Sequence, residues 1–340
     1  MKKVTLYLFI IPFLVGLAGL AIAQTAEELI AAAKKEGKLV VYTGGHTRDE
    51  ITLVVKRFEE KYGIKVEVTR KPTGPIMSLI EAERQAGAVK ADVVGLAIPT
   101  AFLSLRDKGL LAPYQPPNLS EIKAELRDPD GYYTPFTFAP LGFAYHTRLA
   151  KEGTLPKSWK EIGDPKWKGK LVHANPDTSG TAASFVNGMV KLEGWDFYKK
   201  MGANRPLIVE SGLAITPMIL TGEALIGLPG PEQSVLSAKA KGEPIDMYFP
   251  AEGVPVAIYS IGLLKDAPHP NAGKLFINFH LSEEMQRGLT EIRSHTVLEK
   301  LPPPKGAVPL AGLKLIVPDW GWLLKNVKAQ NQEFHKLVKP

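Results

Sequence analysis

The sequence KLVVYTGGHTRDE, residues 38–50, contains the pattern on which the predicted fold depends. Residues 39–43 are apolar, aromatic or β-branched, which is typical of a buried parallel strand. The two glycines that follow permit a tight turn, and TRDE matches a helix-capping box in which Thr47 caps the helix and Glu50 reaches back to the cap. The stretch therefore predicts a buried strand that turns directly into a helix.

The same alternation of strands and helices continues on both sides of this stretch. A second capping box, TAEE, opens a helix that lies between Thr25 and Gly37. The further elements predicted here are helices at 47–62, at 74–84 and from about 100, and strands at 64–69 and 92–97. Such alternation is typical of a parallel sheet with helices on its faces.

A proline-rich break then leads into a second unit of the same kind. Two long extended segments, residues 136–145 and 254–264, bracket this unit. The remaining elements predicted are strands at 170–174, 207–210 and 224–228, and helices at 181–193, 213–221, 271–279, 283–293 and from about 320. We therefore expect an α/β protein with two lobes, each a mostly parallel sheet flanked by helices, joined by a two-segment hinge. The expected boundaries are 24–135 together with 256–310 for lobe 1, 136–255 for lobe 2, and 311–340 for a C-terminal helical segment.

Composition excludes several classes of protein. The chain has 340 residues, 45% of them hydrophobic and 23% charged, so an intrinsically disordered protein is excluded. It has no cysteine, which excludes disulfides, cysteine-based zinc and iron–sulfur sites, and thiol nucleophiles. The formal net charge is +7, but no run of Lys or Arg is longer than two residues. We therefore do not expect nucleic-acid binding, which requires clustered positive charge.

The first 23 residues have the pattern of a secretory signal peptide. Two lysines precede an uncharged apolar stretch, residues 4–20, and AIA at 21–23 is a small-x-small cleavage site. A retained membrane anchor is the alternative, but Pro12 within the stretch favours cleavage after Ala23. We expect an exported protein that is free in a periplasm, since no cysteine is present for lipid attachment.

Five segments follow one another in a characteristic order: LVVYTGGH at 39–46, FEEKYGIKV at 58–66, ADVV at 91–94, PKWKGK at 165–170 and PDTSGT at 176–181. In this order the chain resembles the periplasmic solute-binding proteins of ABC transporters, in the two-crossing class that includes the bacterial ferric-ion-binding proteins. The resemblance covers essentially the whole chain after residue 23. It implies two hinged α/β lobes, a ligand held between them, closure on binding, and delivery to a membrane permease.

The loops after the first strand of each expected lobe contain most of the candidate ligand-binding residues, because open α/β sheets bind ligands beyond the carboxyl ends of their strands. These candidates are Gly45, His46 and Thr47 in lobe 1, and Thr178, Ser179, Gly180 and Thr181 in lobe 2. Ser, Thr and Gly at a helix start offer N–H groups, hydroxyls and the positive end of the helix dipole, which together favour an anion. Ordinary helix capping is the alternative interpretation. We expect Ser179→Ala to weaken solute binding roughly tenfold and to leave the thermal stability of the empty protein nearly unchanged.

Three further candidates are Ser211, Glu232 and Gln233. The resemblance to ferric-ion-binding proteins implies that Ser211 helps to hold an anion and that His46 occupies the position of a histidine ligand. The tyrosine pair of those proteins is absent, because PGPEQS at 229–234 has Glu232 and Gln233 in its place. We expect no metal; His46 and Glu232 are the candidate ligands only if iron is bound.

These observations predict the solute-binding component of an ABC importer, which captures a small anionic or zwitterionic solute such as a carboxylate, phosphonate or phosphate ester. Glu232 is expected to bind an amine or hydroxyl of that solute. The alternatives are ferric iron with a synergistic anion, and an exported hydrolase or transferase. No G-x-S-x-G, H-E-x-x-H or P-loop motif supports an enzyme. We expect a monomer without a cofactor, whose partner is a membrane permease.

Overall fold

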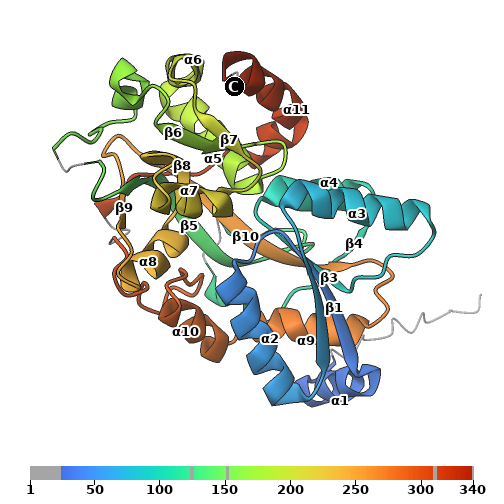
Figure 1. Ribbon diagram of the computed structural model, residues 1–340. Coiled ribbons are helices and arrows are strands. Elements are labelled where there is room, and N and C mark those ends of the chain that lie inside the picture. Colours follow the sequence, from blue (N-terminus) through green and yellow to red (C-terminus); the bar gives the residue numbers. More distant parts are fainter. Residues whose placement is uncertain (1–23, 123–125, 151–152, 309–311, 339–340) are drawn as a thin grey trace, which may run out of the picture.

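The computed structural model describes residues 24–122, 126–150, 153–308 and 312–338, and the predicted signal peptide lies outside these ranges. The chain forms two lobes, with the blue N-terminal elements in one lobe and the green and yellow central elements in the other (Figure 1). Within the described ranges, no helix is long and apolar enough to cross a membrane.

Lobe 1 is built on three parallel strands, with β1 between β2 and β3. Its strands are β1 (Lys38–Thr43), β2 (Lys65–Arg70), β3 (Val93–Leu96) and β4 (Leu111–Ala112). Its helices are α1 (Ala26–Glu36), α2 (Arg48–Tyr62), α3 (Thr73–Gln85), α4 (Pro99–Asp107), α9 (Pro270–His280) and α10 (Glu283–Glu291), with a 3₁₀ helix η1 (Pro117–Glu121). Both predicted capping boxes are present, at the starts of α1 and α2. The predicted strand, turn and helix at residues 38–62 are therefore confirmed.

Lobe 2 repeats this plan, with β6 between β7 and β8 and all three strands parallel. Its strands are β6 (Leu171–Ala174), β7 (Leu207–Val209), β8 (Ile226–Pro231) and β9 (Ile245–Tyr248). Its helices are α5 (Gly180–Glu193), α6 (Trp195–Ala203), α7 (Ile215–Leu220) and α8 (Glu232–Ala240), with 3₁₀ helices η3 (Lys160–Gly163), η4 (Pro165–Trp167) and η5 (Gly212–Ala214). The helices α6 and α8 were not predicted; Glu232, expected in a loop, instead begins α8.

Two long strands, β5 (Thr134–His146) and β10 (Val254–Leu264), connect the lobes. They pair antiparallel with each other, while β10 also pairs with β3 and β5 also pairs with β8 and β9. The strand order β2-β1-β3-β10-β5-β8-β6-β7 therefore runs unbroken from one lobe to the other. The predicted extended segments and the predicted two-lobed α/β class are confirmed.

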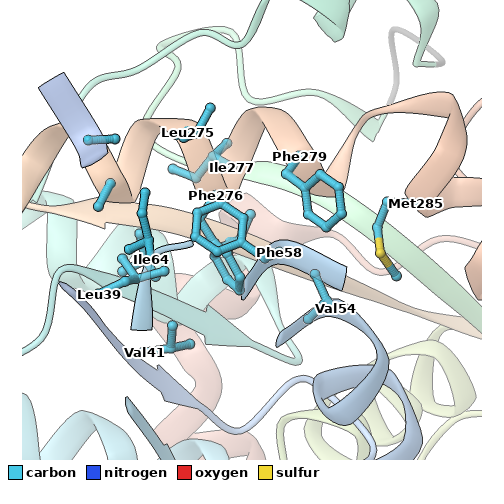
Figure 2. Packing of buried hydrophobic residues seen from close by; sticks show 14 of the residues in the cluster. Leu39, Val41, Val54, Phe58, Ile64, Leu275, Phe276, Ile277, Phe279 and Met285 are labelled. Atoms are coloured by element: carbon cyan, nitrogen blue, oxygen red, sulfur yellow. The ribbon is translucent and has the colours of Figure 1, made fainter. Parts of the chain in front are cut away.

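Each lobe has an apolar core of its own. In lobe 1, Phe58 of α2 packs edge-on against Phe276 of α9 with ring centroids 5.0 Å apart, beside Leu39 of β1 (Figure 2). In lobe 2, Trp159 packs against Phe185 of α5 within a separate cluster. Burial of these side chains stabilises each lobe separately. The loops between the lobes are therefore not needed for either core and can form a binding site.

The C-terminal helix α11 (Trp320–Leu337) contacts both lobes. Leu323 belongs to the apolar cluster around Phe102 of lobe 1, and Phe334 belongs to the cluster around Tyr198 of lobe 2. The side chain of Asn331 donates to the carbonyl oxygen of Pro176, at 3.1 Å, and so supports the loop that leads into α5. A short strand, β11 (Leu315–Ile316), precedes the helix and pairs with β10.

Candidate functional site

A cavity lies between the lobes and measures about 550 Å³, counting the open space at its mouth. Its lining residues are Gly44, Gly45, Thr47, Glu50, Pro72, Thr73, Ala97 and Ser294 from lobe 1, Thr137, Phe138, Ala139 and Tyr259 from the connecting strands, and Ser179, Gly180, Thr181, Ser211, Gly212, Leu213 and Gln233 from lobe 2. Beside it, the N–H of Gly74 donates to the carbonyl oxygen of Thr178 at 3.2 Å, a direct bond between the lobes. The two lobes are therefore closed on each other.

The start of α5 forms one wall of the cavity. Ser179 is the N-cap, and its buried Oγ accepts from the N–H groups of Ala182 and Gly212, both at 3.3 Å. Gly180 and Thr181 are the first two helical residues, so their N–H groups have no acceptor within the helix. Together with the helix dipole, these two N–H groups make this wall suited to an anion.

Two hydroxyl groups extend this wall toward the hinge. Thr181 Oγ1 and the Tyr259 hydroxyl lie 3.3 Å apart. Burial raises the pKa of Tyr259 above its ordinary value, and the neighbouring Glu50 carboxyl adds to the rise. Tyr259 is therefore a neutral phenol at ordinary pH and can donate a hydrogen bond to a ligand.

The predicted residues Gly45 and Thr47 line the opposite wall, but their backbone N–H groups are already bonded within lobe 1. Gly45 N–H donates to the Gly95 carbonyl at 3.1 Å, and Thr47 N–H donates to Glu50 Oε2 at 2.6 Å. A Cβ at Gly45 would lie 2.8 Å from the backbone of Leu96, so only glycine fits there. The first loop shapes the wall, and its N–H groups are not free donors.

The structure places His46 in the core of lobe 1 and not on the cavity wall. The ring is 1% exposed and stacks on Phe136 with centroids 4.1 Å apart. Nδ1 lies 2.7 Å from Thr43 Oγ1, and Nε2 lies 3.0 Å from Nε2 of His280. Burial lowers the pKa of His46 well below its ordinary value, and the neighbouring His280 adds to the fall. The expected contact of His46 with a solute, or with iron, is therefore corrected: both nitrogens are used inside the protein.

Glu232 is also directed away from the cavity. It is 1% exposed, with Oε2 at 2.5 Å from His295 Nε2 and Oε1 accepting from the N–H of Val308 at 3.0 Å. Both carboxylate oxygens are occupied, so the expectation that Glu232 binds an amine or hydroxyl of the solute is corrected. The sequence could not reveal this, because His295 is 63 residues away along the chain.

Of the other predicted residues, Gln233 and Ser211 line the cavity and Thr178 does not. Gln233 lines the cavity, and its amide donates to the Ile292 carbonyl at 3.2 Å. Ser211 also lines it, and its hydroxyl oxygen caps η5 by accepting from the N–H of Leu213. Thr178 lies outside the lining and donates its hydroxyl to the Glu210 carbonyl at 2.6 Å.

Sequence reasoning missed Glu50 as a residue of the site. It was predicted as the second half of a capping box, which it is, yet the structure also places it in the cavity wall at 3% exposure. Its Oε1 accepts from the hydroxyl of Ser294 at 2.6 Å. The two residues are 244 positions apart, so no local pattern could have paired them. Burial raises the pKa of Glu50 above its ordinary value, while the hydrogen bond from Ser294 opposes the rise.

The charge of the cavity is unusual for an anion site. Glu50 is the single ionisable carboxyl group among the lining residues of the described chain, and no Lys, Arg or His lines the cavity within those ranges. Nor do the described residues bring together three His, Asp or Glu side chains that could hold a metal ion. An anion here would be bound by neutral donors and the α5 dipole.

Comparison with known sequences identifies relatives over most of the chain. A family model of bacterial extracellular solute-binding proteins matches residues 54–311. A Haemophilus influenzae protein of unassigned function is 32% identical over 280 residues, covering 79% of this chain and 78% of that protein. A Salmonella typhimurium periplasmic protein, provisionally named for binding 2-aminoethylphosphonate, is 27% identical over 343 residues, covering 95% and 99% of the two chains.

Solved structures have the same two-lobed fold. AfuA from Actinobacillus pleuropneumoniae, a periplasmic binding protein with fructose-6-phosphate bound, superposes with a TM-score of 0.82 at 27% identity, covering 89% of this chain and 99% of that one. Iron-bound HitA from Pseudomonas aeruginosa has a TM-score of 0.75 at 23% identity, covering 87% and 99%, and so shows the fold alone. These relatives are binding proteins. From its family match, its closed two-lobed fold and its interlobe cavity, this chain belongs to the bacterial extracellular solute-binding proteins.

Proposed function

We propose that this protein is the solute-binding component of an ABC importer and captures a small anionic or zwitterionic organic solute between its lobes. The observation that carries the proposal is the start of α5, where Gly180 and Thr181 direct two N–H groups at the interlobe cavity. Hydrogen bonds from such donors to a charged acceptor contribute about 1.5–3 kcal/mol each.

The relatives support an oxyanion as the ligand group. AfuA is described with fructose-6-phosphate bound, and the Salmonella relative is provisionally named for a phosphonate. Both ligands end in a phosphorus oxyanion, which suits a helix N-terminus. We propose that a phosphonate, phosphate ester or carboxylate of this solute lies against residues 179–181, with Tyr259 and Ser211 as further donors.

Ferric iron is disfavoured as the cargo by the donors of this cavity. Iron(III) requires several hard, anionic oxygen ligands, and Glu50 alone offers a carboxylate there. His46 and Glu232, the two candidate ligands, are bonded within the protein. We also propose that the protein binds its solute without converting it. None of the motifs of the hydrolase alternative is present, and the relatives are binding proteins.

Export to a periplasm, cleavage after Ala23 and delivery to a membrane permease are part of the proposal. They are supported by the apolar N-terminal pattern and by the family. N-terminal sequencing of the secreted protein is expected to begin at Gln24.

Native mass spectrometry of protein purified without refolding tests the proposed function. We expect a retained organic solute that is released chemically unchanged, and a colourless titration with Fe(III). A bound solute that is converted to a product, or iron binding that develops colour with an added anion, would replace this proposal by the enzyme or the ferric alternative.

A further inference from the structure

The cavity combines a wall for an anion with a buried carboxyl group that has no cationic neighbour in direct contact. Glu50 is 3% exposed, and the structure shows no ion pair from it to any described Lys, Arg or His within 4.0 Å. Its two hydrogen bonds come from a backbone N–H and a neutral hydroxyl. Burying a carboxylate in this way costs free energy unless a positive charge pairs with it.

Helix capping alone does not account for this position. The equivalent residue of the other capping box, Glu28 of α1, makes the same backbone contact, at 2.9 Å to the N–H of Thr25, and is fully on the surface. Glu50 makes a further bond to Ser294, a residue from the segment after α10, and this bond fixes the carboxyl group at the cavity wall. The second partner therefore orients a group that capping by itself would leave exposed.

A solute with negative charge only would meet Glu50 unfavourably. No Lys, Arg or His in the described lining neutralises the repulsion between a phosphonate dianion and this carboxylate. Arg70 lies outside the lining and beyond ion-pair distance, and its charge offsets the repulsion only in part. An ammonium group on the same solute would reduce the repulsion and give Glu50 a cation in direct contact. Glu50 and Tyr259 line the same cavity, and the Tyr259 hydroxyl lies 3.3 Å from Thr181 Oγ1 beside the anion wall.

We infer that Glu50, held by Ser294, is the subsite for an ammonium group, and that the solute is a short zwitterion with its anion at the start of α5. This inference rests on the proposed function and adds to it which half of the anionic-or-zwitterionic class is bound. Glu50 would then bind the amine of the solute, a contact that the sequence analysis had expected of Glu232.

Calorimetric titration of matched pairs tests the inference. The pairs are 2-aminoethylphosphonate with propylphosphonate, β-alanine with butyrate, and taurine with propanesulfonate, each differing in an ammonium group against a methyl group. We expect the protein to bind at least one zwitterion about 10- to 100-fold more tightly than its partner. Glu50→Gln retains an oxygen for the N–H of Thr47 and is expected to abolish this preference.

Three further variants separate a binding role of Glu50 from a structural one. Glu28→Gln makes the same change in the exposed capping box and is expected to leave the preference intact. Ser179→Ala is expected to weaken both members of a pair without changing their ratio. Ser294→Ala, which frees the carboxyl group, is expected to reduce the preference.

The outcomes distinguish this inference from the proposed function. If the amine-free anions bind as tightly as the zwitterions, or Glu50→Gln leaves the ratio unchanged, the ammonium subsite is wrong while the anion wall stands. If no member of any pair binds, the short-zwitterion assignment is wrong. If, in addition, native mass spectrometry shows no retained solute, the proposed function fails with it.

Discussion

At the scale of single residues, the hydroxyl of Ser179 accepts hydrogen bonds from two helices, from Ala182 of α5 and from Gly212 of η5. The side chain therefore ties the two helix starts together as well as facing the cavity. The expectation that Ser179→Ala would leave the stability of the empty protein unchanged is corrected, because the substitution leaves two N–H groups without this acceptor.

Ser179→Ala is expected to weaken binding of the retained solute about tenfold and to lower the free energy of unfolding by about 1–2 kcal/mol. Calorimetry and urea unfolding measure the two effects. Ser282→Ala is the matched control, because Ser282 caps α10 through Met285 and is not among the residues that line the cavity. It should lower stability by a similar amount and leave affinity unchanged; equal affinity in both variants contradicts the anion wall.

Two buried histidines, His46 and His280, are linked by a hydrogen bond between their rings, and both are neutral. His280 Nδ1 lies 3.0 Å from the Phe276 carbonyl and must donate to it, so His280 Nε2 accepts from His46 Nε2–H. His46 Nδ1 then accepts from the hydroxyl of Thr43. A proton added to Nε2 of His280 would set two N–H groups against each other.

Stability should therefore fall in mild acid. Burial lowers the pKa of both His173 and His280 from 6.5 to about 4. Between these values the unfolded chain binds protons that the folded protein does not. The free energy of unfolding therefore has its full value above pH 6.5 and decreases as the pH falls toward 4. His173→Leu should reduce the slope by about 1.4 kcal/mol per pH unit in this window. Urea unfolding at pH 5 to 8 measures the slope, and an unchanged slope contradicts the neutral burial of His173.

At the scale of elements, the segment after α10 connects several parts of the site. Gln233 of α8 donates to Ile292, Ser294 donates to Glu50 of α2, and the hydroxyl of Thr137 of β5 donates to the carbonyl of His295 at 2.6 Å. Polar contacts thus bind this segment to both lobes where they meet. Its position decides how Glu50 and Gln233 face the cavity.

The Glu232–His295 pair is expected to stabilise the junction of α8 with this segment. Glu232→Gln and His295→Asn should each lower the free energy of unfolding, and the double variant should lower it by about 1–3 kcal/mol less than the sum, because the two groups lose the same bond. Urea unfolding of the four proteins measures this coupling. Additive effects would show that the 2.5 Å contact contributes nothing net.

Gly180 allows α5 to approach lobe 1. A Cβ there would lie 2.9 Å from Ile98 Cγ2 and 3.2 Å from Thr73 Oγ1, both in lobe 1. Gly180→Val should therefore oppose closure and weaken solute binding by more than the roughly tenfold loss of Ser179→Ala, with Gly180→Ala between them. Calorimetry ranks the variants; full affinity in Gly180→Val would show that binding does not require this approach.

At the scale of the whole molecule, the hinge consists of β5 and β10, and α11 contacts both lobes. The sheet stays continuous through the hinge, so rotation of the lobes must bend these two strands. The bond from Gly74 to Thr178 is available only when they are closed.

Solute is expected to reduce the radius of gyration by closing the lobes. Gly74→Val supplies the open reference, because a Cβ at Gly74 would lie 2.9 Å from the carbonyl oxygen of Asp177 in the other lobe. Small-angle scattering should show the wild type with solute as more compact than Gly74→Val under the same conditions. Equal radii, with solute bound to the wild type, contradict the closure mechanism.

The sequence alone determined most of the elements, because capping boxes, apolar periodicity and glycine turns act within a few residues. The strand, turn and helix at residues 38–62 and the extended segments predicted at 136–145 and 254–264 correspond to β1, α2, β5 and β10. It also directed attention to Ser179, Gly180 and Thr181, since the start of a helix after a strand is a local feature. It missed α6 and α8, and the first residues of α8 lie in the glycine- and proline-rich stretch 229–234.

Only the tertiary structure decided which side chains face the cavity. Glu50 and Glu232 both lie in the first turn of a helix that follows a strand, and no local pattern shows which of the two faces the cavity. Glu232 is turned away because His295 lies beside it, and Glu50 is held at the cavity because Ser294 lies beside it. Both partners come from one segment far along the chain, so the role of each carboxylate depends on how α10 packs and not on its own sequence.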